Sequence, residues 1–240
     1  LSFAPPASKD FGQLGAVWPR RSVLADVASG GSRTLTLANS VEMPYVGLGT
    51  TMLEGAEGER AILEAVKDHG YRMVDTAQAY SNEAEVGRAL ARSGVARPEL
   101  FIVTKLSEPR DMRSASRVRA LVKKQLKKLN TTYIDLYFLH GPDDFPEGCL
   151  RAWRVLEDLY SQGTIRALGV SNFDLAQLKE FRARVRVQPH AVQNKFSVYH
   201  HGNSPMPEEP FLQAVQTAAA VGVPMAFMGY CNLDVYPNVL

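Results

Sequence analysis

The chain has 240 residues, of which 45% are hydrophobic, and a formal net charge of +2. This length and composition suit one large α/β domain with a sizeable core. The clustered lysines, Lys123, Lys124, Lys127 and Lys128, fall at helical spacing, so a solvated helix face explains them and no nucleic-acid partner is indicated.

Cysteines, histidines and apolar runs narrow the class of protein further. Cys149 and Cys231 belong to no CxxC or Cys/His spacing, so we expect no disulfide framework and a reducing compartment. His200 and His201 have no acidic residue or cysteine nearby to complete a ligand set, so we expect a polar loop and no metal there. No apolar run reaches the roughly 18 residues of a membrane span. These features predict a soluble, cytoplasmic protein without a membrane partner.

The start of the chain differs in composition from the rest. Residues 1–32 are rich in Ala, Ser, Gly, Pro and Arg and show no strong periodicity, which predicts a flexible N-terminal extension before one domain over residues 33–240. A transit-peptide remnant, which would place the protein in an organelle, is the alternative, and Asp10 and Asp26 count against it. Since the first residue is Leu rather than Met, we expect the chain to be processed or part of something longer.

From about residue 33 the sequence predicts a regular alternation of short and long elements. The segment 34–47 comes first and predicts a hairpin that turns near Asn39 and could plug the bottom of a barrel. Short apolar or β-branched runs then predict strands over residues 45–50, 71–75, 100–105, 134–140, 165–172, 190–194 and 223–228. Apolar stripes between them predict helices over residues 58–70, 82–94, 114–129, 149–163, 174–184 and 209–222, several of which end in Gly.

Strands that alternate with helices predict a parallel sheet covered by helices, either a doubly wound sheet or a (β/α)8 TIM barrel. Two features favour the barrel. No GxGxxG follows the first strand, so the main signature of a doubly wound dinucleotide site is missing. Polar residues also stand at the carboxyl ends of successive strands, where barrels build their active sites: Asp75, Lys105, His140, Asn172 and Gln193.

If the barrel closes, Asp75, Lys105 and His140 point into one cavity, and Tyr80 joins them from the loop after Asp75. A tyrosine hydroxyl is a poor acid at neutral pH unless a nearby cation stabilises its phenolate, and Lys105 could supply that cation. Asp75 is the natural counter-ion for a buried lysine. His140 could donate a hydrogen bond to a substrate carbonyl oxygen or relay a proton with Tyr80. This set of residues suits the reduction of a carbonyl group.

These residues lie in segments that resemble one family. DTAQAYSNEAEVGRAL is similar to the signature of the aldo-keto reductases, and TLTLANSVEMPYVGLGT, IVTKL, YIDLYFLHGP and GTIRALGVSNF resemble its other blocks in the right order. The resemblance covers roughly residues 34–230. It implies a TIM barrel, a monomer, a nicotinamide cofactor, NADPH, and a small aldehyde or ketone as substrate.

The resemblance also implies roles for individual residues. It implies a catalytic tetrad of Asp75, Tyr80, Lys105 and His140, with Tyr80 as the proton donor. It further implies cofactor contacts, which are expected from Asp75, Thr50, Thr51, Ser171, Asn172, Gln193 and Phe227. Ser, Asn and Gln side chains complement the acceptor and donors of the nicotinamide amide, and Phe227 stands where the family usually stacks a tyrosine. Lys195 departs from the family, which usually has Glu there.

Only seven strands are evident, since only GYCNLDVYPNVL follows the strand that ends at Met228. In the family, the eighth β/α unit closes the barrel and carries the basic segment that grips the 2′-phosphate of NADPH. Three hypotheses are therefore open: an NADPH-dependent carbonyl reductase, a non-catalytic NADPH-binding regulatory subunit, and an inactive fragment of a reductase.

Overall fold

The computed structural model describes residues 34–195 and 226–230. The predicted extension over residues 1–32, the predicted helix over residues 209–222, the histidine pair and Cys231 lie outside these residues. Among the described helices, none is both long enough and apolar enough to cross a bilayer.

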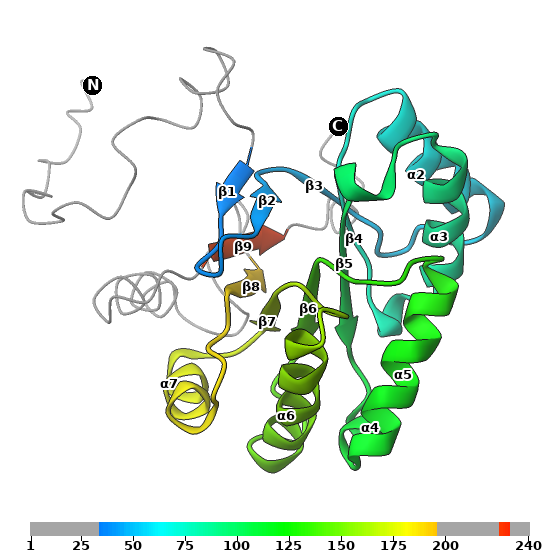
Figure 1. Ribbon diagram of the computed structural model, residues 1–240. Coiled ribbons are helices and arrows are strands. Elements are labelled where there is room, and N and C mark those ends of the chain that lie inside the picture. Colours follow the sequence, from blue (N-terminus) through cyan, green and yellow to red (C-terminus); the bar gives the residue numbers. More distant parts are fainter. Residues whose placement is uncertain (1–33, 196–225, 231–240) are drawn as a thin grey trace, which may run out of the picture. The chain divides into compact units, whose positions relative to one another are not determined.

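The centre of the fold is a parallel sheet of seven strands in the order β3-β4-β5-β6-β7-β8-β9 (Figure 1). The strands are β3 (Gly47–Gly49), β4 (Met73–Asp75), β5 (Phe101–Leu106), β6 (Leu136–Leu139), β7 (Leu168–Ser171), β8 (Ala191–Lys195) and β9 (Ala226–Tyr230). Each strand pairs with its neighbours in the chain, whereas a doubly wound sheet reverses its order at one point. The predicted strands and the barrel-type topology are therefore confirmed.

Helices follow the strands and lie in chain order along the outer face of the sheet (Figure 1). They are α2 (Gly55–Lys67), α3 (Glu83–Arg92), α4 (Pro109–Met112), α5 (Ala115–Lys128), α6 (Glu147–Ser161) and α7 (Leu175–Arg184), with 3-10 turns η1 (Gln78–Tyr80) and η2 (Arg97–Glu99). Local signals explain two of the starts. Ser114 caps α5 by accepting a hydrogen bond from the Arg117 backbone, and Asp174 forms a capping box with Gln177 at the start of α7.

The predicted helix ends differ from the observed ones by up to three residues, and the end at Arg184 is as predicted. The helix predicted over residues 58–70 runs from Gly55 to Lys67, and the one predicted over residues 149–163 ends at Ser161. The glycines that seemed to end these helices lie two or three residues beyond them, with φ of 72° at Gly70 and 74° at Gly163. In the left-handed region they turn the chain away after the last helical residue, as a glycine just past a helix does.

The predicted hairpin is confirmed. Strands β1 (Thr34–Thr36) and β2 (Glu42–Pro44) pair antiparallel. Its buried side chains, Leu37, Val41 and Met43, pack with residues at or next to the amino ends of the parallel strands, namely Met73, Phe101, Leu136, Ala167 and Ala191. The hairpin thus covers the amino-terminal end of the sheet interior, as expected of a plug.

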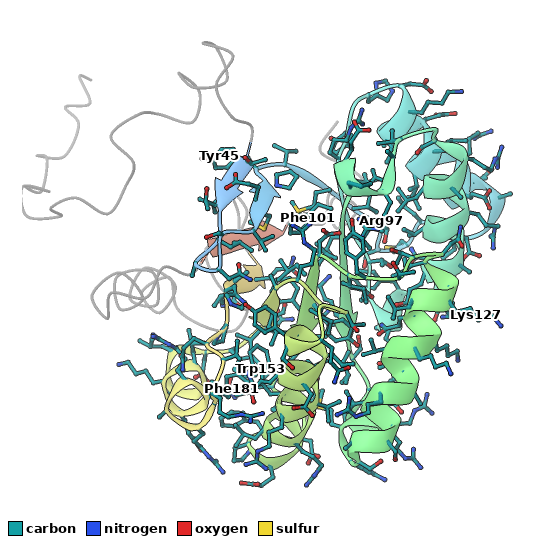
Figure 2. The ribbon with its side chains drawn as sticks, viewed as in Figure 1. Tyr45, Arg97, Phe101, Lys127, Trp153 and Phe181 are labelled. Atoms are coloured by element: carbon teal, nitrogen blue, oxygen red, sulfur yellow. The ribbon has the colours of Figure 1, made fainter. Side chains whose placement is uncertain are left out.

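Helices cover the other face of the sheet with a second apolar layer. Between α6 and α7, the rings of Trp153 and Phe181 meet edge to face with centroids 5.0 Å apart, and both side chains are fully buried (Figure 2). Lys127 extends outward from α5 in the same view, so the lysine-rich surface of this helix is the solvated face that its spacing predicts.

Candidate active site

The site arises from the alternation of side chains along the strands. Successive residues of a strand point to opposite faces, so Phe101 and Val103 of β5 face the interior with the hairpin, while Ile102 faces the helices. The same alternation places Lys105 on the interior side, above Val103. It repeats in the neighbouring strands, so the residues that follow the apolar interior layers at the carboxyl ends are Asp75, Lys105, His140, Ser171 and Gln193.

A buried ion pair lies at the centre of this polar layer. Lys105 Nζ donates to Asp75 Oδ1 and, at 3.2 Å, to the backbone oxygen of Thr76. Gln193 Nε2 donates to the other oxygen of Asp75 at 2.6 Å. The Lys105 side chain is 1% exposed and the Asp75 side chain 12% exposed, so each charge depends on the other and on these hydrogen bonds for compensation.

A second polar network on the outer face of the sheet fixes the strand that carries Lys105. Gln125 on α5 donates to the backbone oxygen of Lys105 at 3.1 Å and accepts from the Tyr137 hydroxyl at 2.7 Å. Thr104 donates to the buried Glu83 at 2.9 Å. These groups tie β5 to α3 and α5, so the ion pair is held from both faces of the sheet. Tyr137 is fully buried.

Tyr80 reaches the ion pair from the turn after β4. It ends the 3-10 turn η1, and Ser81 follows with φ of 58° before α3 begins. The Nζ atom of Lys105 lies 5.1 Å from the centroid of the Tyr80 ring. At the start of α3, the buried Asn82 accepts from the Thr76 hydroxyl at 2.8 Å and donates to the Thr50 backbone oxygen at 2.6 Å, which holds the turn against the loop after β3.

His140 follows β6 and faces Tyr80. Their rings are nearly perpendicular, at 80°, with centroids 5.5 Å apart. Burial, and then the positive charge of Lys105, lowers the pKa of His140 from 6.5 to about 4, although Asp75 acts in the opposite direction. The imidazole is therefore neutral at physiological pH. The structure thus brings together all four side chains predicted to form the catalytic tetrad.

The residues predicted to contact a nicotinamide lie beside this group at the ends of β7 and β8. Ser171 is buried, and its hydroxyl oxygen has no hydrogen-bond partner among the described residues. Asn172 has φ of 61° and donates to the backbone oxygen of His140 at 2.7 Å. Its backbone N–H donates to the Gln193 carbonyl at 3.0 Å, so the ends of β7 and β8 are joined beside Ser171.

The other predicted cofactor residues are described to different extents. Thr50 is buried, and its hydroxyl donates to the backbone oxygen of Asp75 at 3.0 Å, so its side chain supports β4. Thr51 is half-buried in the loop after β3. Phe227 lies in β9, where its backbone stands opposite Val192, and its side chain is outside the described part of the chain.

Sequence reasoning missed two polar side chains at the site. Ser107 Oγ lies 2.7 Å from Nδ1 of His140. Gln78, in the same turn as Tyr80, accepts through Oε1 from the backbone N–H of Ser107 at 2.9 Å. The available signal was that Ser107 directly follows β5, two residues after Lys105, where barrel sites recruit side chains.

The sequence profile of the Aldo/keto reductase family matches residues 45–229. Among curated proteins, the chain is 40% identical over 166 residues to the Glyoxal reductase of Bacillus subtilis, covering 68% of this chain and 58% of that protein. It is 37% identical over 171 residues to the Morphine 6-dehydrogenase of Pseudomonas putida, covering 71% of this chain and 57% of that protein. The chain therefore spans somewhat more than half the length of these relatives.

Comparison with solved structures also finds aldo-keto reductases. The crystal structure of an aldo/keto reductase from Brucella melitensis superposes with a TM-score of 0.73 at 28% identity, over 86% of this chain and 75% of that one. A Bombyx mori aldo-keto reductase in complex with NADP superposes with a TM-score of 0.68 at 29% identity, over 82% of this chain and 65% of that one. By sequence and by fold, the chain belongs to the Aldo/keto reductase family.

Proposed function

We propose that the protein uses NADPH to reduce a small aldehyde or ketone to the alcohol, with Tyr80 as the proton donor. The observation that carries this proposal is the buried pair of Lys105 and Asp75 next to the rings of Tyr80 and His140. Burying a charged lysine is costly, and here its charge lies beside a phenol that can give up a proton.

In the proposed mechanism Tyr80 gives its hydroxyl proton to the carbonyl oxygen of the substrate. The negative charge that then remains on the phenol oxygen is stabilised by the Lys105 ammonium group, whose Nζ lies 5.1 Å from the ring centroid. Asp75 compensates the charge of that ammonium group and holds it in place. Gln193 in turn orients Asp75, because its Nε2 donates to Asp75 Oδ2 at 2.6 Å.

His140 supplies a neutral donor to the same carbonyl oxygen. With its pKa lowered to about 4, the imidazole carries one proton at neutral pH and adds no full positive charge beside Lys105. A hydrogen bond from a donor fixed in advance stabilises the charge that develops on the oxygen during reduction. Tyr80 and His140 would thus approach the substrate oxygen together.

The residues at the ends of β7 and β8 fit a nicotinamide amide. The buried Ser171 hydroxyl has no hydrogen-bond partner within the described part of the chain. Asn172 follows Ser171 in the chain, and Gln193 stands opposite Ser171 in the sheet. Such a hydroxyl is costly to leave unpaired, and a carboxamide would satisfy it. When bound, NADPH supplies the hydride that reduces the carbonyl carbon. The neighbour solved with NADP supports this choice of cofactor.

One relative is named Glyoxal reductase, which supports a small carbonyl compound as substrate, and another is named Morphine 6-dehydrogenase, which supports interconversion of an alcohol and a carbonyl group. The test is to titrate the chain with NADPH by fluorescence and then to follow NADPH oxidation with a panel of aldehydes that includes glyoxal. Saturable binding with turnover would support the reductase. Tight NADPH binding with no oxidation on any aldehyde would favour the regulatory subunit instead, and neither binding nor cooperative unfolding would favour the inactive fragment.

A further inference from the structure

Ser107 contacts the candidate active site but is not one of the four residues of the predicted catalytic tetrad. Its hydroxyl oxygen lies 2.7 Å from Nδ1 of His140, and both side chains are half-buried. The backbone N–H of Ala79, in the turn that carries Tyr80, donates to the same oxygen at 3.3 Å. One hydroxyl therefore connects the His140 ring to the Tyr80 turn.

The other contacts of this hydroxyl determine the direction of its bond to His140. A serine hydroxyl has one proton to donate and two lone pairs that accept. The Ala79 N–H occupies one lone pair of Ser107 Oγ. Among the described residues, His140 Nδ1 is the only atom hydrogen-bonded to Ser107 Oγ that could accept its proton. If Nδ1 carried a proton instead, Ser107 Oγ would accept twice and its own proton would have no partner among those residues. Donation from Ser107 to Nδ1 gives both the hydroxyl proton and the Nδ1 lone pair a partner.

We propose that Ser107 is a positioning residue that donates to Nδ1 of a neutral His140 and so keeps the ring proton on Nε2. This inference rests on the proposed role of His140 as a donor to the substrate carbonyl. A neutral imidazole has one N–H, and its partner at the other nitrogen decides which nitrogen carries it. With Nδ1 accepting, Nε2–H is the group left to meet a carbonyl oxygen.

The charges around the ring agree with this assignment. Burial and Lys105 lower the pKa of His140 to about 4, and the opposing effect of Asp75 is smaller, so the ring has a single proton to place. Had the ring been doubly protonated, both nitrogens would donate and Ser107 would have no tautomer to select.

Gln78 holds Ser107 in position. Its Oε1 accepts from the backbone N–H groups of Ser107 and Glu108, at 2.9 and 3.2 Å, and its Nε2 donates to Asp111 at 2.6 Å. Because Gln78 and Tyr80 belong to the same 3-10 turn, the loop after β5 is fixed relative to the proton donor. The Ser107 hydroxyl is therefore held by backbone and side-chain contacts that do not involve His140.

Nitrogen NMR of the full chain labelled with ¹⁵N-histidine tests the tautomer directly, with the His140 signals assigned by their loss in His140→Gln. We expect one neutral tautomer with the proton on Nε2, and Nδ1 shifted as a hydrogen-bonded acceptor. In Ser107→Ala the Nδ1 signal should move toward that of a free acceptor nitrogen. A proton found on Nδ1 in the unaltered chain, or an Nδ1 signal that Ser107→Ala leaves in place, would overturn the proposal.

Turnover provides the second readout. Loss of one hydrogen bond that orients the donor should lower kcat for aldehyde reduction by roughly three- to ten-fold in Ser107→Ala, with a smaller effect on KM. Ser107→Thr keeps the hydroxyl and should restore kcat, while Ser161→Ala, an exposed serine on α6, should leave it unchanged. A Ser107→Thr variant as slow as Ser107→Ala would contradict the hydroxyl's role.

The two readouts separate this inference from the proposed function. The NMR signals of His140 need neither cofactor nor substrate, so they report the tautomer even in a chain that reduces nothing. The predicted tautomer without turnover would refute only the reductase assignment, whereas turnover with the opposite tautomer would refute only the role of Ser107.

Discussion

Replacing Lys105 with methionine should destabilise the folded chain strongly, because it leaves Asp75 buried without its cation. The Asp75 side chain is 12% exposed and would keep Gln193 as a donor at 2.6 Å. Removing one member of a buried ion pair costs about 3–5 kcal/mol, because the remaining charge stays out of water. Methionine has similar length and no charge, so we expect a cost in that range for Lys105→Met, measured by urea denaturation followed by tryptophan fluorescence.

A double-mutant cycle separates the charge from the packing. Asp75→Asn alone leaves Lys105 without a counter-ion, and the double variant Lys105→Met with Asp75→Asn leaves no charge unpaired. We expect the double variant to lose less stability than the two single variants combined, by about 1–3 kcal/mol. A cost below about 1 kcal/mol for Lys105→Met, or costs that simply add, would refute the view that the two charges compensate each other.

Three further predictions concern stability and reactivity. Between about pH 6.5 and 4 the unfolded chain binds a proton at His140 that the folded chain excludes. The free energy of unfolding should therefore fall by roughly 3 kcal/mol as the pH is lowered across that range. In denaturation curves measured at several pH values, His140→Asn should remove this part of the pH dependence. Gly169→Ala should lower the free energy of unfolding by about 1–3 kcal/mol, because the added Cβ would lie 2.3 Å from the Phe138 ring. Thermal unfolding measures the effect, and Gly49→Ala, whose added Cβ would have no atom within 4 Å, is the control. Burial, and then nearby acidic residues, raises the pKa of the Cys149 thiol to about 12. In a variant without the other cysteine, a thiol reagent should therefore label the chain only after it unfolds. Fast labelling of the folded chain would contradict this.

The sequence predicted the strands and the layer of polar residues at their ends because both follow from local rules. Apolar and β-branched runs form the buried strands, and the parallel order brings their carboxyl ends together. Asp75, Lys105 and His140 can therefore be grouped from the sequence alone. Tyr80 could be added from its place in the loop after Asp75, but the short 3-10 turn that sets its ring beside Lys105 and His140 follows from no periodicity.

The hydrogen-bond partners could not be predicted, because they depend on loop conformations and on rotamers of residues far apart in the chain. Ser107 and His140 are 33 residues apart, and their contact requires the loop after β5 to be fixed by Gln78. Asp135 lies within a predicted strand, yet it is fully buried and accepts from Arg97 at 2.6 Å and from Arg166 at 2.7 Å. Each arginine comes from a different part of the chain, so the pairing appears only in the folded structure.

The central claim, that Tyr80 donates the proton, is tested most directly by the single-turnover rate of NADPH oxidation with a saturating aldehyde in Tyr80→Phe. Tyr45→Phe, which alters an exposed tyrosine beside β2, is the matched control. We predict that Tyr80→Phe binds NADPH as the unaltered chain does and lowers the rate by about 10²- to 10⁴-fold, the contribution of a positioned general acid, while Tyr45→Phe leaves it unchanged. A Tyr80→Phe chain that oxidises NADPH at the rate of the unaltered chain would contradict the claim.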